Sequence, residues 1–75
     1  MAIYDDAVAI SKNYLGPAGP QFIDRQIKSH LKIEPGQLAA GNMADLARWC
    51  LISGKMIMDD DAEAQAFSEK IKALK

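Results

Sequence analysis

The densest cluster of potential ligand side chains is an acidic run in the last third of the chain. Asp59, Asp60 and Asp61 are followed closely by Glu63, and carboxylate oxygens are the ligands that Ca²⁺ prefers. An EF-hand loop also needs a glycine at its sixth position and a bidentate glutamate at its twelfth. Counted from the first aspartate, those positions hold Ala64 and a lysine. The calcium pattern therefore fails, and the run is better explained as a solvated helix start, where the helix dipole favours negative charge.

One histidine and one cysteine are the other residues from which catalysis could be built. A nucleophile needs a nearby base, and that base needs a third group to orient it. His30 and Cys50 both fall on apolar helix faces, and no third group is spaced to orient them. We therefore expect a core histidine and a buried thiol. The chain also lacks a glycine-rich phosphate loop and the four ligands of a structural zinc site, so we predict no enzyme, no cofactor and no metal.

A basic stripe follows one side of the second predicted helix. Arg25, Lys28 and Lys32 are three and four residues apart, so they share a helix face and could contact phosphates. Asp24 lies beside them, and the formal net charge of the whole chain is -1. We therefore favour a solvated helix face. A nucleic-acid-associated accessory protein that uses this stripe remains an alternative.

The segment 43–58, MADLARWCLISGKMIM, is apolar on nearly every side, whereas a surface helix of a small monomer normally shows a clear polar stripe. Trp49, Ile52 and Met56 form an apolar stripe of their own, bordered by Arg48 and Lys55. One interpretation is that the first or last helix covers this stripe. The other is contact with another chain, because Trp and Met are enriched in interfaces that have a polar rim.

Length and composition describe one small domain, residues 1–75. Such a chain buries only about 60% of its unfolded surface, and a single cysteine excludes an internal disulfide, so oligomerisation is the common remaining aid. Acidic and basic residues nearly balance, which gives no global attraction to nucleic acid or membrane. No signal peptide or membrane span is recognisable, and we expect a cytoplasmic protein.

The predicted elements are all helical, because the chain has no threonine and one valine and is poorly supplied with strand-forming residues. Gly16 and Pro17 end the first helix, and the second begins at Pro17 or Pro20. Asn42 and Asp60 are the expected N-caps of the third and fourth helices. Four helices are predicted: the first at about 2–15, the second from 17 or 20 to 32, the third at 43–58 and the fourth from 59–61 onward. The connection 33–42 is predicted to contain a Pro35-Gly36 turn and a single helical turn at 37–40.

Each predicted helix has an apolar stripe at helical spacing. We expect Ile33 and Leu38 of the connection to complete the core. The expected core-facing residues are Ile3, Ala7, Ile10 and Tyr14 in the first helix; Ile23, Ile27, His30 and Leu31 in the second; Leu46, Cys50, Ile57 and their neighbours in the third; and Ala64, Phe67, Ile71 and Leu74 in the fourth.

Several of these residues occur in a familiar order. Tyr14-Leu15-Gly16-Pro17 joins two helices, Leu38 follows in the connection, Leu46-Ala47-Arg48-Trp49 lies in the third helix, and Phe67 and Ile71 lie in the last. From Tyr14 onward the chain resembles a small helical domain of unknown function found at the C-terminal ends of some bacterial signalling proteins, including serine/threonine kinases. Pro20 departs from that pattern. The resemblance implies a regulatory or docking role, in a free-standing chain or a piece of a longer one, and supplies no catalytic residue.

The sequence therefore predicts an all-α fold, a compact four-helix domain with a Pro/Gly-containing connection between its second and third helices. The function we favour is a non-catalytic protein-interaction or dimerisation module in bacterial regulation, using Trp49, Ile52 and Met56 with Arg48 and Lys55. The partner is a second copy or another protein, with no membrane. The alternatives are the nucleic-acid accessory protein and a small-molecule binding domain with a pocket between the second and third helices.

Overall fold

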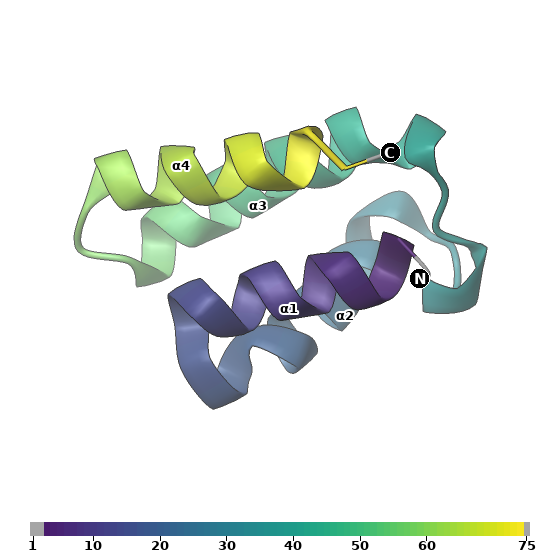
Figure 1. The fold of residues 1–75 in the computed structure, drawn as a ribbon, viewed down its shortest axis with the longest axis horizontal. Helices are drawn as coiled ribbons and strands as arrows, with labels where there is room; N and C mark the ends of the chain where they lie inside the picture. Colours follow the sequence, from purple (N-terminus) through teal and green to yellow (C-terminus); the bar gives the residue numbers. More distant parts are fainter. Residues whose placement is uncertain (1–2, 75) are drawn as a thin grey trace.

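Helical segments follow one another along the whole described part of the chain. The computed structural model describes residues 3–74 (Figure 1), and none of these residues lies in a β-strand. The all-α prediction is therefore confirmed. The elements are α1 (Ile3–Leu15), a 3₁₀ turn (Gly16–Ala18), α2 (Gly19–Gln26), a π-helical turn (Ile27–Leu31), two further 3₁₀ turns (Pro35–Gln37 and Ala40–Asn42), α3 (Met43–Ile57) and α4 (Asp61–Lys72).

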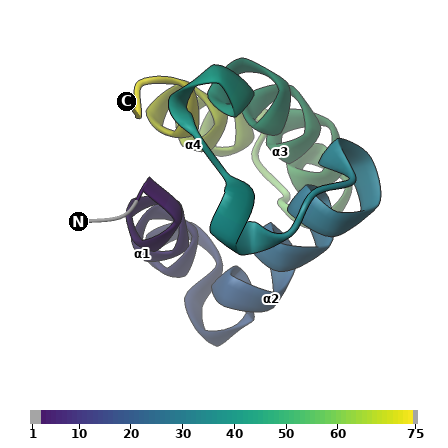
Figure 2. The same ribbon diagram turned by 90° about the vertical axis from the view of Figure 1, so that its right-hand side faces the viewer.

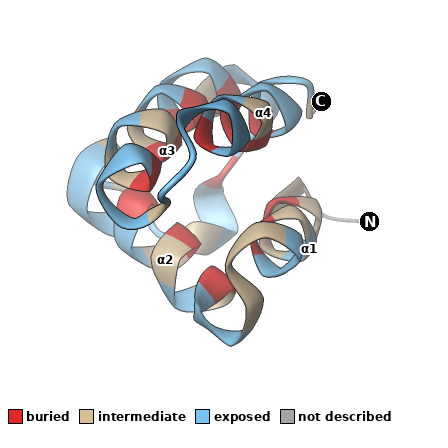
Figure 3. Cartoon of the chain, turned by 90° about the vertical axis from the view of Figure 1, so that its left-hand side faces the viewer, coloured by how far each residue is buried: buried red, intermediate tan, exposed pale blue. Residues whose placement is uncertain are grey.

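These elements pack as two pairs. α1 packs on α2 and α3 packs on α4, and the pairs meet where α1 contacts α4 and where α2 and its π turn contact α3. Figure 2 shows the connection between α2 and α3 crossing one end of the molecule. Buried residues lie on the inward faces of the helices (Figure 3). The core thus lies between the two pairs.

An aromatic cluster joins the two pairs at the core. Phe67 of α4 is fully buried. Its ring centroid lies 5.3 Å from that of Tyr14 and 5.9 Å from that of Phe22, distances at which aromatic rings attract each other. The Nζ of Lys70 lies 5.5 Å from the centre of the Tyr14 ring on its outer side. One α4 side chain therefore ties together the ends of α1 and α2.

The corner between α1 and α2 depends on two glycines. Gly16 has a φ of +64°, the left-handed conformation that was expected at the end of the first helix. Gly19 lies against the α1 backbone: a Cβ atom placed there would be 2.6 Å from the Lys12 nitrogen and 2.7 Å from the Ser11 carbonyl oxygen. The buried Ser11 hydroxyl donates to the Ala7 carbonyl oxygen at 2.8 Å. Small residues here let the two helices approach closely.

Two polar contacts define the α3–α4 hairpin. The backbone N–H of Ala62 donates to Oδ1 of Asp60 at 2.9 Å, so the predicted N-cap of α4 is confirmed. The buried Ser68 hydroxyl donates to the carbonyl oxygen of Ala47 at 2.7 Å. The small serine side chain thus brings α4 close to the α3 backbone at this crossing.

The second predicted helix does not form as one regular element, although consecutive helical turns fill nearly all of its predicted extent of 17 or 20–32. A 3₁₀ turn holds Pro17, α2 begins at Gly19, and after Gln26 the chain widens into the π turn. Lys32 ends this segment with a φ of 59°, a left-handed conformation uncommon for a residue with a side chain. A π turn adds one residue per hydrogen-bonded loop, so side chains after Ile27 no longer follow the α-helical stripe.

The connection 33–42 confirms one prediction and corrects two. Leu38 is buried and Ile33 packs against the core, as expected. The predicted turn at 37–40 is wrong, because Leu38 and Ala39 are extended and separate two 3₁₀ turns. Asn42 does not cap α3 with its side chain, because its Oδ1 instead accepts from the Ala39 N–H at 3.0 Å.

Candidate interaction surface

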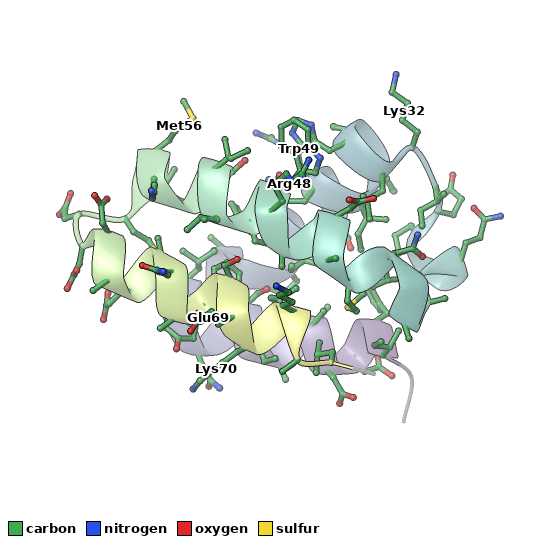
Figure 4. The ribbon with its side chains drawn as sticks, turned by 90° about the horizontal axis from the view of Figure 1, so that it is seen from above. Lys32, Arg48, Trp49, Met56, Glu69 and Lys70 are labelled. Carbon is green, nitrogen blue, oxygen red and sulfur yellow. The ribbon has the colours of Figure 1, made fainter. Side chains whose placement is uncertain are left out.

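The apolar stripe of α3 is exposed rather than covered by α1 or α4. Met56 is 82% exposed and Ile52 is 46% exposed, while Trp49 is half-buried. Figure 4 shows Met56 and Trp49 on one side of α3, with Met56 projecting away from the other helices. Neighbouring apolar side chains that are exposed together on one helix are a candidate surface for binding a partner.

His30 corrects the prediction of a core histidine. Its side chain is exposed and stacks on the Trp49 ring, with centroids 3.8 Å apart and planes 8° from parallel. The π turn brings His30 to this position, since the change of helical phase after Ile27 moves it off the core-facing stripe. The His30 ring from the π turn therefore covers part of the Trp49 side chain. This stacking contact restrains Trp49, which lies at one end of the stripe.

Ile57 is a second correction. It was expected on the core-facing side of α3, but it is 58% exposed. It is the last residue of α3 and lies about 100° further round the helix than Met56, so it adds exposed apolar surface beside the stripe at the end of the helix. We call Trp49, Ile52, Met56 and Ile57 the α3 patch. Arg48 and Lys55, the two residues predicted to border the stripe, are both exposed.

A groove of about 390 Å³ lies beside the α3 patch, between α2 and the end of α3. Across it, the hydroxyl of Ser53 donates to Oε1 of the buried Gln26 at 3.0 Å, which ties the two helices together. Apolar and polar side chains share its walls, most of them from α2 and α3 and the others from the end of α1, the 3₁₀ turn and the π turn. They are Leu15, Ala18, Gln21, Phe22, Arg25, Gln26, His30, Ser53, Met56 and Ile57.

The structure divides the predicted basic stripe between two places. Arg25 lines the groove, whereas Lys28 and Lys32 line a separate open hollow of about 630 Å³ that also contains Glu34. Lys32 projects outward at the edge of the molecule (Figure 4). Because a carboxylate shares the hollow with the two lysines, the stripe does not form a surface of one charge sign.

Asp24, the acid beside that stripe, has a partner on α1. The Tyr4 hydroxyl donates to its Oδ1 at 2.6 Å. This hydrogen bond to a carboxylate, together with desolvation and the negative charges of Asp24 and Asp5, raises the pKa of Tyr4 to about 12. The contact links α1 to α2.

The two residues considered for nucleophilic chemistry lie in different environments. Cys50 is fully buried in the core, as predicted, and burial raises the pKa of its thiol to about 12. His30 lies on the surface against Trp49. Residues 3–74 contain no cluster of three or more side chains that could hold a metal ion. A protonated thiol in the core is a poor nucleophile, so its role is packing.

Burial of Cys50 predicts a loss of stability at alkaline pH. Its pKa is about 12 in the folded chain against an ordinary value of 9.0, so above pH 9 the unfolded chain releases a proton that the folded chain retains. The free energy of unfolding therefore falls as pH rises from 9 toward 12. Urea titrations at pH 7 to 11, followed by circular dichroism, measure this fall.

Two variants separate the groups responsible for that fall. Cys50→Ala removes the thiol. The free energy of unfolding of this variant is therefore expected to decline only from near pH 10, where tyrosine in the unfolded chain starts to ionise. Tyr4→Phe is expected to keep the onset near pH 9. Equal alkaline profiles for the wild-type chain and Cys50→Ala would contradict the assignment.

Comparison with known proteins adds no family to this picture, since no protein-family model, curated protein or solved structure matches the chain. Within residues 3–74, no helix combines the length and apolar character needed to cross a membrane. The geometry of the α3 patch and the groove is therefore the basis for a functional argument.

Proposed function

We propose that this chain is a non-catalytic protein-interaction module that self-associates through the α3 patch. The observation that carries the proposal is the exposure of Ile52 and Met56 on the side of α3 away from the core, together with Ile57, which is uncovered at the end of the helix. A contiguous apolar stripe with Trp49 at one end and the cationic rim of Arg48 and Lys55 has the composition of an interface centre with a polar edge.

Charge placement supports a second copy of the chain as the partner. In a two-fold contact, the same patch meets itself. With the two-fold axis perpendicular to α3, the two α3 helices run antiparallel. The exposed acidic turn 59–61 that follows one α3 then approaches the half of the partner's α3 that carries Arg48. Self-association would also cover apolar surface that a domain of 75 residues cannot bury by itself.

Bacterial regulation is the setting we propose, in the cytoplasm. The support is the order of Tyr14-Leu15-Gly16-Pro17, Leu38 and Leu46-Ala47-Arg48-Trp49, which resembles the helical domain at the C-terminal ends of bacterial signalling proteins. A module of this kind would bring two regulatory chains together, or dock one chain on another, without chemistry of its own.

Replacing Ile52 with aspartate tests the proposal. We expect the wild-type chain to change from monomer to dimer as its concentration rises, and Ile52→Asp to remain monomeric, because a buried unpaired charge at an interface centre costs roughly 2 kcal/mol or more. Sedimentation equilibrium at several concentrations measures the masses. Since Ile52 is half-exposed within one chain, the unfolding free energy of the dilute monomer should change little.

Gln65→Asp is the matched control, because it places the same new charge at an exposed position of α4. This variant should associate as the wild-type chain does. A wild-type chain that sediments as a monomer at millimolar concentration would falsify self-association. Equal loss of association in both variants would show that net charge, rather than the α3 patch, controls the mass.

A further inference from the structure

The groove between α2 and α3 has the character of a small-ligand site. Its volume of about 390 Å³ falls within the range of roughly 300–1,000 Å³ that is typical of such sites. Leu15, Ala18 and Phe22 provide apolar surface on one wall, and Met56 and Ile57 provide it on the other. An apolar ligand surface would therefore be covered from two sides.

The polar groups in the groove carry charge of one sign. Arg25 is the one residue with a permanent charge among the described lining residues, and no acid is among them. The hydrogen bond from Ser53 occupies Oε1 of the Gln26 side chain, and both residues line the groove. An anionic group at Arg25 would meet no carboxylate within the groove.

The size of the groove argues against a partner helix as its occupant. One turn of an α-helix, about 10 Å across and 5.4 Å long, already occupies a comparable volume. A single guanidinium also matches one carboxylate, which it binds with two parallel hydrogen bonds. Phosphate sites, in contrast, usually gather several cationic or N–H donors, and the two nearby lysines line a different hollow.

We propose that this groove binds a small amphipathic carboxylate, with its apolar body between Phe22 and Ile57 and its carboxylate on Arg25. This function is additional to self-association. Ile52, the centre of the α3 patch, does not line the groove, whereas Met56 and Ile57 belong to both. The two functions can therefore be tested separately.

The test is a titration of the full chain with octanoate, 1-octanol and octylammonium, followed by amide chemical shifts in ¹H–¹⁵N NMR spectra. Octanoate is expected to shift the amides of residues 15–26 and 53–57 with saturation, and to bind about tenfold more tightly than the alcohol, as a charge-assisted hydrogen bond requires. Octylammonium should bind most weakly. The titration is repeated on Ile52→Asp, which keeps the groove and removes the proposed dimer contact.

Arg25→Gln is expected to lower octanoate affinity about tenfold, to that of octanol, while leaving the sedimentation behaviour of the chain unchanged. Lys72→Gln is the matched control, because it removes an exposed positive charge outside both the groove and the α3 patch, and it should leave octanoate affinity unchanged. Equal loss in the two variants, equal affinity for octanoate and octanol, or no saturable shifts in the groove would each overturn the proposal. Shifts restricted to the α3 patch would also overturn it and would indicate detergent-like binding to that surface.

Discussion

Replacing Gly19 with alanine is expected to lower the free energy of unfolding by roughly 3 kcal/mol, the upper part of the range for overpacking. The new Cβ would lie 2.6–2.7 Å from backbone atoms of Ser11 and Lys12. Backbone atoms cannot rotate aside as a flexible side chain can, so α1 and α2 must separate. Separation weakens the packing of Ala7 and Ile23, which are fully buried near this contact.

Such a loss is a large part of the total free energy of unfolding of a domain of this size, since native chains are stable by roughly 0.05–0.15 kcal/mol per residue. Urea denaturation followed by far-ultraviolet circular dichroism measures it. Gly36→Ala is the control, because its Cβ would meet no atom within 4 Å, and that variant should differ little from the wild-type chain. Equal stability of the two variants would contradict the close approach of the α1 and α2 backbones at Gly19.

Replacing Phe67 with alanine is expected to have the other large effect, a loss of roughly 3–5 kcal/mol. The ring is fully buried and contacts Tyr14 and Phe22, so its removal leaves a cavity where the two helix pairs meet. Refilling that space requires movement of both α1 and α2. Much of the folded population is therefore expected to be lost near room temperature.

Phe67→Leu and Ala66→Gly make the result specific. Leucine fills part of the cavity, so the first variant should lose clearly less stability than Phe67→Ala. Ala66→Gly tests the neighbouring α4 position and should cost about 1 kcal/mol through helix propensity alone. Similar losses for Phe67→Ala and Ala66→Gly would show that Phe67 does not join the helix pairs.

The sequence was sufficient for the elements whose apolar residues keep a constant helical phase. The stripe of Ala64, Phe67 and Ile71 predicted the buried side of α4, and all three are fully buried. Asp60 predicted where α4 starts, because its cap depends on residues that are adjacent in the chain. Local rules worked where local contacts decide the structure.

Prediction failed where tertiary contacts changed the helical phase. No residue type between Ile27 and Leu31 marks a π turn, and a stripe extended at 3.6 residues per turn therefore put His30 in the core. Ile57 failed for a related reason: it shares the core-facing side of an ideal wheel, but α4 turns back only after residues 58–60 and leaves the end of α3 uncovered. The groove could not be predicted while His30 and Ile57 were both placed in the core, because each of them lines it.

Asn42 shows that the choice between two good local hydrogen bonds is also set by the surrounding chain. Its side chain could cap α3, yet it accepts from Ala39 because the 3₁₀ turn brings that N–H within reach. Spacing alone cannot rank two such bonds. The exposure of the stripe on α3 was similarly undecided, since it depends on where α1 and α4 pack.

Because His30 stacks on Trp49, tryptophan fluorescence can follow one contact between the α2 side of the molecule and α3. Trp49 is the chain's one tryptophan, and its indole ring lies against an imidazole ring from the π turn. Its fluorescence therefore reports contact between the α2 side and α3, whereas circular dichroism reports helix content throughout. In a two-state domain the two signals change together. An emission change at lower denaturant concentration than the dichroism change would reveal that this contact beside the groove opens while the helices are still formed.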